Sequence, residues 1–434
     1  MKPAEEPDPG QGDVPGRIRF REWIGKYAAI LVALILTAGC ILASPFLQPP
    51  YLLSILVILC SGILYLIRGT RAISISIIVL AILYGLGWLP LLIFVITLGI
   101  VVGGEIAYRA SRGGHHRYLT YIAASSAGGG LVVLYLAAIG YLEQIRPLLL
   151  FLILLGVLVA VLLKAALQER NDILMVEGLG VAMTMYLFAD LNIPVENMAL
   201  LTTAAIIALS FGYLAYRFGV ADMSGLFSGS LVGIIIIVFA DVRWFLVMLV
   251  FLVIGSAATR YRYDAKAAAG IGESHGGVRG YVNVFANGLV GVAAAVLYSL
   301  SGGSPLALAL YLGAIATAAA DTMGGEIGMT SKDPVLITTF EPVPKGTNGG
   351  VTLLGEAAAL VASFAIALTA FLLGLGDLRI LLAATIAGFL GCNVDSLVGA
   401  VFENRGFIGN AGTNLIATFA GGLIAILLAI LLVL

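Results

Sequence analysis

The sequence predicts an all-α, polytopic helical membrane protein. Of its 434 residues, 61% are hydrophobic and only 11% are charged, whereas a soluble domain usually carries about 25% charged residues. Apolar runs long enough for a helix to cross a bilayer recur from Trp23 to the C-terminus. The alternating strands of roughly ten residues that a membrane β-barrel requires are not found in the sequence.

The apolar runs predict about 14 to 15 transmembrane helices by length. Pro90, with Gly85 and Gly87, favours a break in the fourth run, so the third and fourth runs also fit one bent helix or a re-entrant pair. We place the spans at 24–46, 51–67, 72–86, 88–104, 119–140, 147–163, 173–189, 197–216, 225–240, 243–258, 283–300, 305–320, 351–375, 379–391 and 414–434.

Three regions follow along the chain. Residues 1–22 are expected to form a disordered cytoplasmic tail, since the first of them are rich in Pro, Gly and acids. The tail lacks the features of a signal peptide, and a prokaryotic plasma membrane is the simplest location. Residues 23–200 are predicted to be an N-terminal transmembrane scaffold, and residues 201–434 a catalytic transmembrane domain.

The distribution of basic residues predicts the orientation. With the N-terminus in the cytoplasm, the loops on that side hold 20 of the 23 Lys and Arg residues. Only Arg146, Arg243 and Arg379 are left for the outer side. Because basic residues concentrate in cytoplasmic loops, the polar loops of this chain are expected to be cytoplasmic.

Two similar stretches suggest a degenerate parallel repeat. Trp88 and Trp244 each begin an apolar run that leads into a basic loop. Each loop ends in G-G-x-x-x-Y, at Tyr118 in the first and Tyr281 in the second. Apolar runs also match each other easily by chance, so both interpretations stay open.

The first polar cluster runs from Arg260 to Asn287 and contains Lys266, Arg279 and several glycines. Arginine binds phosphate through a bidentate fork, and glycines let backbone N–H groups approach an anion. A loop that contacts lipid headgroups would have the same basic residues. Asn283 and Asn287 lie four residues apart in an apolar run, where they predict either substrate contact or hydrogen bonding between helices.

The second polar cluster begins with Asp321 and Glu326, directly after a small-residue span. Two carboxylates at a membrane face suit Mg²⁺, which takes few protein ligands. Helix capping is the alternative for Asp321, but an acid at membrane depth is usually functional.

A glycine-rich segment ends this same loop and leads directly into a span. It comprises Lys345, Gly346, Thr347, Asn348, Gly349 and Gly350. Such a turn at a helix N-terminus is an anion site, because free N–H groups and the helix dipole point outward. It differs from the P-loop pattern, so it does not imply the fold of a soluble NTPase.

The third and fourth polar clusters lie near the C-terminus. Asp395 occurs at a span end amid small residues, and Asn410 and Asn414 stand at the start of the last span. Helix capping would account for Asn410. All four clusters are predicted at the cytoplasmic ends of spans.

Several function classes find no support in the sequence. A net charge of −1 suggests no nucleic-acid partner. The three cysteines, Cys40, Cys60 and Cys392, form neither a disulfide framework nor a zinc spacing. No Ser-His-Asp set, H-E-x-x-H or C-x-x-C motif is present.

Together the four clusters resemble the transmembrane protein 19 family, which includes the phytyl-phosphate kinases of phototrophs. The resemblance covers about residues 200–434. It rests on G-x-R-x-x-x-x-x-x-A-N-G from Gly277, A-D-T-x-x-x-E-I-G from Ala320, G-T-x-G-G-V from Gly346, and D-S-L-x-G-A from Asp395. The chain departs from the family at Gly324-Gly325, where Ser is common, and at Val284-Phe285, where Gln is common.

The resemblance implies transfer of a phosphoryl group from a nucleotide to an isoprenyl monophosphate, phytyl or geranylgeranyl, in the membrane. CTP is the first choice of donor, with UTP or ATP as alternatives, and Mg²⁺ is the expected cofactor. The implied catalytic residues are Asp321, Glu326, Asp395 and Arg279, with the three carboxylates as metal ligands. Lys345 to Gly350 would bind the nucleotide. The implied substrate contacts are Lys266, Arg279, Asn283, Asn287, Asn410 and Asn414.

Three alternatives remain at this level. The same loops would serve a kinase of a free isoprenoid alcohol, or a nucleotidyltransferase that makes a CDP-linked lipid. A membrane transporter is the third, although transporter sites tend to lie near the midplane of the bilayer. The oligomeric state is left open.

Overall fold

The computed structural model describes residues 31–67, 70–111, 114, 116–167, 173–191 and 197–433. Within these ranges, 11 helices are long and apolar enough to cross a membrane. Four shorter apolar helices accompany them, including one over Leu31–Ala43. The predicted class, an all-α polytopic membrane protein, is confirmed. The tail predicted for residues 1–22 lies outside the described residues.

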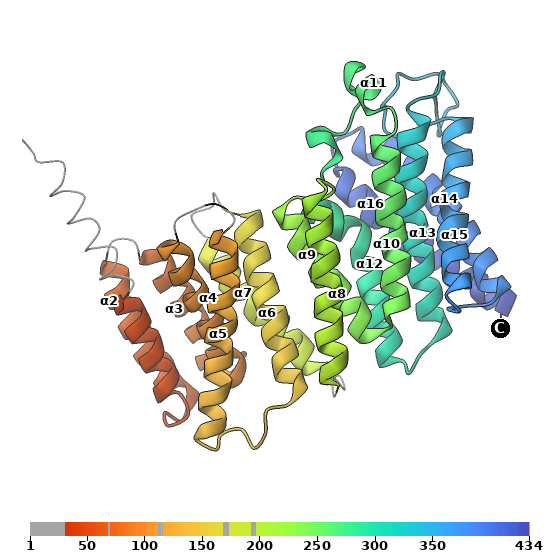
Figure 1. The fold of residues 1–434 in the computed structure, drawn as a ribbon. Coiled ribbons are helices and arrows are strands. Elements are labelled where there is room, and N and C mark those ends of the chain that lie inside the picture. Colours follow the sequence, from red (N-terminus) through yellow and green to blue (C-terminus); the bar gives the residue numbers. More distant parts are fainter. Residues whose placement is uncertain are drawn as a thin grey trace, which may run out of the picture. The chain divides into compact units, whose positions relative to one another are not determined.

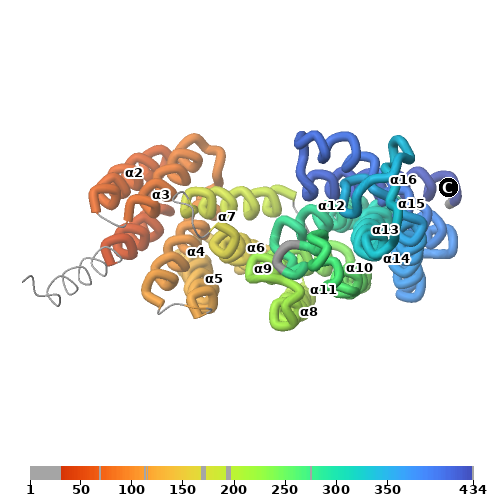
Figure 2. The backbone as a smooth tube through the Cα atoms, turned by 90° about the horizontal axis from the view of Figure 1, so that it is seen from above, coloured from red at the N-terminus to blue at the C-terminus, as the bar shows by residue number. Residues whose placement is uncertain are grey.

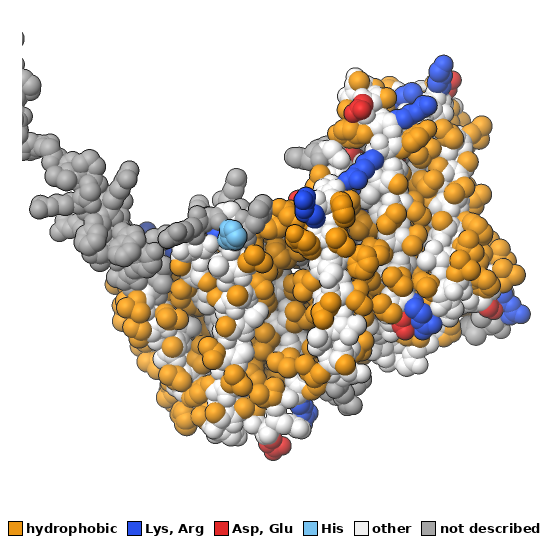
Figure 3. All heavy atoms as spheres, viewed as in Figure 1, with side chains coloured by type: hydrophobic (Ala, Val, Ile, Leu, Met, Phe, Trp, Pro, Cys, Tyr) orange, Lys and Arg blue, Asp and Glu red, His pale blue; other side chains and the backbone are white. Residues whose placement is uncertain are grey.

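The surface agrees with a membrane location. Figure 3 shows hydrophobic side chains over the flanks of the helices and charged side chains mostly near their ends. Many large apolar side chains stay exposed, for example Val253, Leu360 and Leu427. Exposed apolar surface of this extent suits contact with lipid. Which end of the helices faces the cytoplasm stays a prediction.

The chain divides into two compact units, Met1–Asn192 and Ile193–Leu434. Beyond the helix at Leu31–Ala43, the elements of the first unit that the structure describes are helices (Figure 1), and Pro begins two of them because its fixed φ fits the first helical turn. Its labelled helices are α2 (Pro50–Leu66), α3 (Arg71–Gly85), α4 (Leu91–Ala110), α5 (His116–Ala138), α6 (Pro147–Ala166) and α7 (Ile173–Asp190).

The region that the sequence left open as two spans, one bent helix or a re-entrant pair contains two separate helices, which excludes the single bent helix. Helix α3 ends at Gly85 and α4 begins at Leu91. Gly87 between them has a φ of 75°, a left-handed conformation that ends a helix readily. Pro90 then precedes the first turn of α4.

The core of the first unit contains buried charges. Lys164 forms ion pairs with Glu105 and, at 3.4 Å, with Glu177, and Tyr121 donates a hydrogen bond to Glu177. Arg109 adds a second cation beside Glu105, at 2.5 Å. Because buried charges are expensive unless paired, this network neutralises itself inside the helix bundle.

The second unit surrounds a central helix, α13. Seen from above in Figure 2, α13 stands among α10, α12, α14, α15 and α16, all of which contact it. The elements are α8 (Met198–Arg217), α9 (Met223–Phe239), α10 (Val242–Arg260), α11 (Tyr263–Ala268), η1 (Ser274–Gly277), α12 (Tyr281–Leu300), α13 (Pro305–Gly328), β1 (Val335–Leu336), β2 (Gly350–Val351), α14 (Leu353–Leu372), α15 (Leu378–Val398), η2 (Gly399–Glu403) and α16 (Asn410–Val433).

Small residues let the neighbours of α13 approach its backbone. A Cβ added at Gly313 would lie 2.5 Å from the Gly421 carbonyl oxygen in α16, and one at Gly388 in α15 would lie 2.6 Å from the Ala316 Cβ. Such close approach, made by small residues, is the usual packing of membrane helices. Three residues of α13 in this region, Ala316, Thr317 and Ala320, are fully buried.

Helix α13 is longer than predicted. The span was expected to end at residue 320, with Asp321 and Glu326 in a loop. The helix instead continues to Gly328, because Gly324 packs closely against Gly355 at the start of α14. Both acids therefore project from the last turns of a helix.

The loop after α13 is held by a small antiparallel ribbon. Strand β1 pairs with β2, with Val335 opposite Val351 and Leu336 opposite Gly350. The Ile337 amide also donates to the Gly349 carbonyl oxygen at 3.0 Å. The ribbon fixes the glycine-rich segment at the N-terminus of α14.

Whether the two halves of the chain are repeats stays a prediction.

Candidate functional site

A polar cavity of about 280 Å³ lies in the second unit, where the ends of α12 to α16 meet the loop after α13. Its wall is built from segments that are far apart in the sequence. The predicted site residues that line it are Arg279, Asn283, Asn287, Asp321, Glu326, Lys345, Gly346, Thr347, Asn348, Gly349, Gly350, Asp395, Asn410 and Asn414. Lys266 is the one predicted residue that does not line it.

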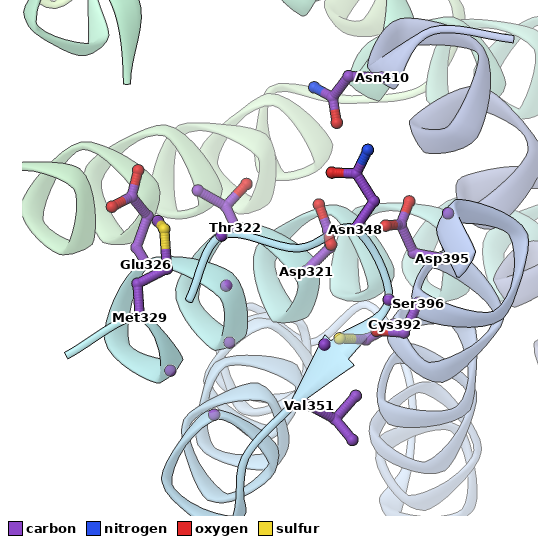
Figure 4. A pocket seen from close by; sticks show the side chains of 18 of the residues that line it. Asp321, Thr322, Glu326, Met329, Asn348, Val351, Cys392, Asp395, Ser396 and Asn410 are labelled. Atoms are coloured by element: carbon purple, nitrogen blue, oxygen red, sulfur yellow. The ribbon is translucent and has the colours of Figure 1, made fainter. Parts of the chain in front are cut away.

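Asp321 of α13 and Asp395 of α15 form a pair. Figure 4 shows both side chains pointing into the same space, with Asn348 and Asn410 nearby. The two carboxyl groups lie within hydrogen-bonding reach of each other, and the charge of Glu403 acts on both. Because adjacent carboxylates repel each other, the pair favours a proton or a cation between them.

Glu326 lies apart from this pair. It follows Asp321 by five residues in α13, which places the two side chains on different faces of the helix. Among the described residues, no three His, Cys, Asp or Glu side chains are grouped closely enough to hold a metal ion. The predicted ligand set of Asp321, Glu326 and Asp395 is therefore not assembled, whereas the pair fits a Mg²⁺ ion that keeps most of its other ligands from water and phosphate.

Lys266 holds the Glu326 side chain in place through an ion pair. The Lys266 Nζ ion-pairs with the Glu326 carboxylate and also donates to the Thr259 carbonyl oxygen at 2.9 Å. Both side chains are buried. The structure thus places Lys266 behind the cavity wall, where it neutralises Glu326.

Arg279 is the buried basic residue that lines the cavity. Its backbone is held by the turn between α8 and α9, where its N–H donates to Val220 and its carbonyl accepts from Asp222, at 2.9 and 3.1 Å. The guanidinium passes α10 at Gly255, where a Cβ would clash with it, and lies 5.2 Å from the centre of the Phe251 ring.

Arg279 is buried, and its guanidinium forms no hydrogen bond or ion pair with any residue that the structure describes. Desolvation lowers the pKa of Arg279 from its ordinary value, and the negative charges of Glu273, Glu326 and Asp321 oppose that shift. Since arginine stays protonated in proteins, the cavity holds a fixed cation that has no hydrogen-bond or ion-pair partner among the described residues. An anion is the ligand that such a group favours.

The glycine-rich segment closes the cavity from the loop side. Gly346 and Gly349 have φ values of 82° and 78°, which glycine adopts without strain. Gly349 contacts α15 directly, since a Cβ there would lie 2.5 Å from the Ser396 carbonyl oxygen. The Asn404 amide also donates to the Asn348 carbonyl oxygen at 2.9 Å. Thr352 then caps α14, whose N-terminus faces the same cavity.

Three buried acceptor atoms in the cavity wall have no hydrogen-bond partner among the described residues. They are the Oδ1 atoms of Asn287, Asp395 and Asn414. Buried polar atoms are nearly always paired. Their convergence on one cavity indicates that a ligand, an ion or water completes their bonding.

Three cavity-lining acids were not predicted from the sequence: Glu273, Glu356 and Glu403. Glu356 accepts a hydrogen bond from Asn393 at 3.1 Å, and Glu403 accepts one from Thr413 at 3.0 Å. Glu403 ends a π-helical turn, η2, and such turns often mark functional sites. A weak signal existed for Glu403, since it closely follows the D-S-L-x-G-A motif.

Comparisons with known proteins match the second unit. A model of the family described as "Integral membrane protein DUF92" matches residues 206–430, more than half of the chain. All of these residues fall in the second unit. No solved structure matches the chain.

Several curated proteins are similar. An uncharacterized membrane protein of Methanocaldococcus jannaschii is 38% identical over 208 residues, which are 48% of this chain and 85% of that protein. Protein PGR of Arabidopsis thaliana is 33% identical over 229 residues, 47% of this chain and 79% of that protein.

Chloroplastic protein VTE6 of Arabidopsis thaliana is 33% identical over 192 residues, 42% of this chain and 58% of that protein. The resemblance drawn from the four motifs is thereby confirmed. The chain belongs to the DUF92 family of integral membrane proteins.

Proposed function

We propose that the second unit is a phosphotransferase that moves the γ-phosphoryl group of a nucleoside triphosphate onto an isoprenyl monophosphate. The observation that supports this most directly is one cavity in which an unpaired, buried Arg279 faces the Asp321–Asp395 pair. The resemblance of the four motifs to the transmembrane protein 19 family, which implies this reaction, is consistent with it.

The charges suit a reaction between two phosphates. An oxygen of the acceptor monophosphate would attack the γ-phosphorus and form a P–O–P bond. The bond to the β–γ bridging oxygen would break, and the nucleoside diphosphate would leave. Because the acceptor is already an anion near neutral pH, this reaction needs positioning and charge neutralisation more than a strong base.

The cavity offers separate positions for the two substrates. Arg279, with Asn283 and Asn287 on α12, would hold the acceptor phosphate. The glycine-rich turn, with the exposed Lys345 and the N-terminus of α14, would hold the nucleotide phosphates. Asn410 and Asn414 line the cavity beside them.

Asp321 and Asp395 would hold Mg²⁺, which would neutralise phosphate charge when bound. Asp395 contributes an oxygen that is buried and free of other partners among the described residues. Glu326 has no such role in this proposal, because Lys266 already neutralises it.

The test is a phosphorylation assay on purified protein in detergent, with Mg²⁺ and γ-labelled CTP, UTP or ATP in turn. Phytyl and geranylgeranyl monophosphates are offered beside the free alcohols. We expect label in the isoprenyl diphosphate and its loss in Asp321→Asn, because the amide cannot replace the carboxylate charge. Asp377→Asn is the matched control, since Asp377 caps α15 through its side chain and asparagine caps equally well.

Other outcomes would contradict the proposal. A folded Asp321→Asn variant with normal turnover would remove this residue from the site. Product mass that shows a nucleoside monophosphate added to the lipid would indicate a nucleotidyltransferase. No product from folded wild-type protein would overturn phosphoryl transfer altogether.

A further inference from the structure

A second cavity adjoins the polar one and differs from it in chemistry. It has a volume of about 100 Å³ and lies between α8, α9, α10 and α12. Nearly all of its wall is apolar, with Phe211, Phe245, Met248 and Leu252 among the lining side chains. Because its wall shares only Arg279 and Asn283 with the polar cavity and is otherwise mostly apolar, this space suits hydrocarbon.

The two cavities meet at Arg279 and Asn283, which line both. The Arg279 guanidinium has no ion-pair partner among the described residues, and its Phe251 neighbour lines the apolar cavity. A ligand that occupies both would carry a phosphate at one end and an apolar chain at the other. The joint volume thus has the polarity of an amphiphile.

We propose that the apolar cavity binds the first segment of the hydrocarbon tail of the lipid monophosphate, directly behind the phosphate held by Arg279. At about 100 Å³, the cavity accommodates part of a single chain and not the two chains of a diacyl lipid. The phosphate head group of this ligand rests on the proposed function, whereas the apolar chain rests on the second cavity alone.

Gly229 of α9 marks the far part of this cavity. It follows Gly225 by one helical turn, and Gly225 contacts the Arg279 backbone so closely that a Cβ there would clash with its carbonyl oxygen. Four residues of helix correspond to about 6 Å. A Cβ at Gly229 would meet no atom within 4 Å, so a larger side chain there begins in open space and occupies the far part of the cavity.

The experiment measures binding by the rise in thermal unfolding temperature of purified full-length protein, without nucleotide. The ligands are geranylgeranyl monophosphate and dimethylallyl monophosphate, whose short chain we expect to reach no farther than Gly229. We expect Gly229→Leu to weaken geranylgeranyl monophosphate binding about tenfold, as expected for about two methylene groups that lose their burial. Dimethylallyl monophosphate should bind almost unchanged.

Gly130→Leu is the matched control. Gly130 also lies inside a helix, α5, with no atom within 4 Å of an added Cβ, and it lines neither cavity. It should bind both ligands as wild type does.

Three results would overturn the assignment. They are equal affinity of wild type for both ligands, no binding of either, or the same affinities in Gly229→Leu and Gly130→Leu. Turnover is measured separately. A chain-length effect without phosphoryl transfer would leave the tail site in place and refute the proposed function, whereas turnover without a Gly229 effect would do the reverse.

Discussion

At the scale of single residues, Arg279 shows how the backbone presents a charge. Both its N–H and its carbonyl are bonded to the α8–α9 turn, and Gly255 leaves room for its side chain. The guanidinium is therefore positioned before any ligand arrives. Such preorganisation reduces the conformational entropy that is lost when a ligand binds.

We expect Arg279→Lys to raise the KM for isoprenyl monophosphate while the KM for the nucleotide stays unchanged. Lysine keeps the charge but loses the planar fork that binds phosphate through two hydrogen bonds. One hydrogen bond to a charged group contributes about 1.5–3 kcal/mol, which corresponds to about ten- to hundredfold in KM. Steady-state kinetics with each substrate varied in turn measure this.

Arg260→Lys serves as the control, because Arg260 is exposed and bonds to the Phe218 carbonyl oxygen outside the cavity. An equal change in both variants would show that Arg279 does not bind the acceptor.

Lys266 and Glu326 make a prediction about stability. Lys266→Met leaves a buried carboxylate unpaired, which typically lowers the free energy of unfolding by about 3–5 kcal/mol. The double change Lys266→Met/Glu326→Gln should recover most of that loss. Thermal unfolding of the two single variants and the double variant gives the interaction free energy as a double-mutant cycle.

If Lys266→Met unfolds like wild type but loses affinity for the acceptor, the ion pair is not structural. The contact with substrate that the sequence suggested for Lys266 would then hold.

The sequence could identify these residues but could not pair them. Lys266 and Glu326 are 60 positions apart, and nothing local in either segment indicates a partner. Their buried ion pair depends on how α11 and α13 pack. Glu273 and Glu356 were missed for a related reason, since each lies among residues that indicate an ordinary loop or helix start.

At the scale of elements, the glycine-rich turn depends on conformation and on close contact. We expect Gly349→Ala to raise the KM for nucleotide by on the order of tenfold. Alanine at positive φ costs about 1–2 kcal/mol, and its Cβ would lie 2.5 Å from both the Ser396 carbonyl oxygen and the Ala400 Cβ. The turn would therefore move away from α15.

Gly406→Ala separates these two effects. Gly406 has a φ of 72°, and a Cβ there would meet no atom within 4 Å. It carries the same backbone strain without the contact. A KM for nucleotide that rises equally in the two variants would show that the close approach to α15 is unimportant.

Helices were predicted best where the length of an apolar run alone determines their position. Every predicted span corresponds to a described apolar helix, including the short pair α3 and α4. Ends that depend on packing were predicted less well. The sequence T-M-G-G-E-I-G after Asp321 looks like a loop because of its three glycines, yet Gly324 permits the contact with Gly355 that keeps α13 helical. The π-helical turn η2 had no sequence signal.

At the scale of the whole molecule, every residue that lines the polar cavity belongs to the second unit. We expect a fragment of residues 193–434 to fold in detergent and to transfer phosphoryl groups with the donor preference of the full chain. Purified fragment and full-length protein are compared in the same assay, with Asp321→Asn in both as the control for background.

A folded fragment that binds nucleotide but gives no product would assign the first unit a part in the reaction. Substitutions in the buried network of Lys164, Glu105 and Glu177 would then test that part first.

The tight packing around α13 limits where this protein can change. At Gly313 and Gly388 a single added methyl group would meet a backbone or Cβ atom of the neighbouring helix, and backbone contacts cannot move aside as a flexible side chain can. Larger residues are thus barred at these contacts of α13 with α16 and α15. Substitutions that change substrate preference would therefore fall in the loop after α13 or near Gly229 of α9. The packed helices around α13 leave little room for such changes.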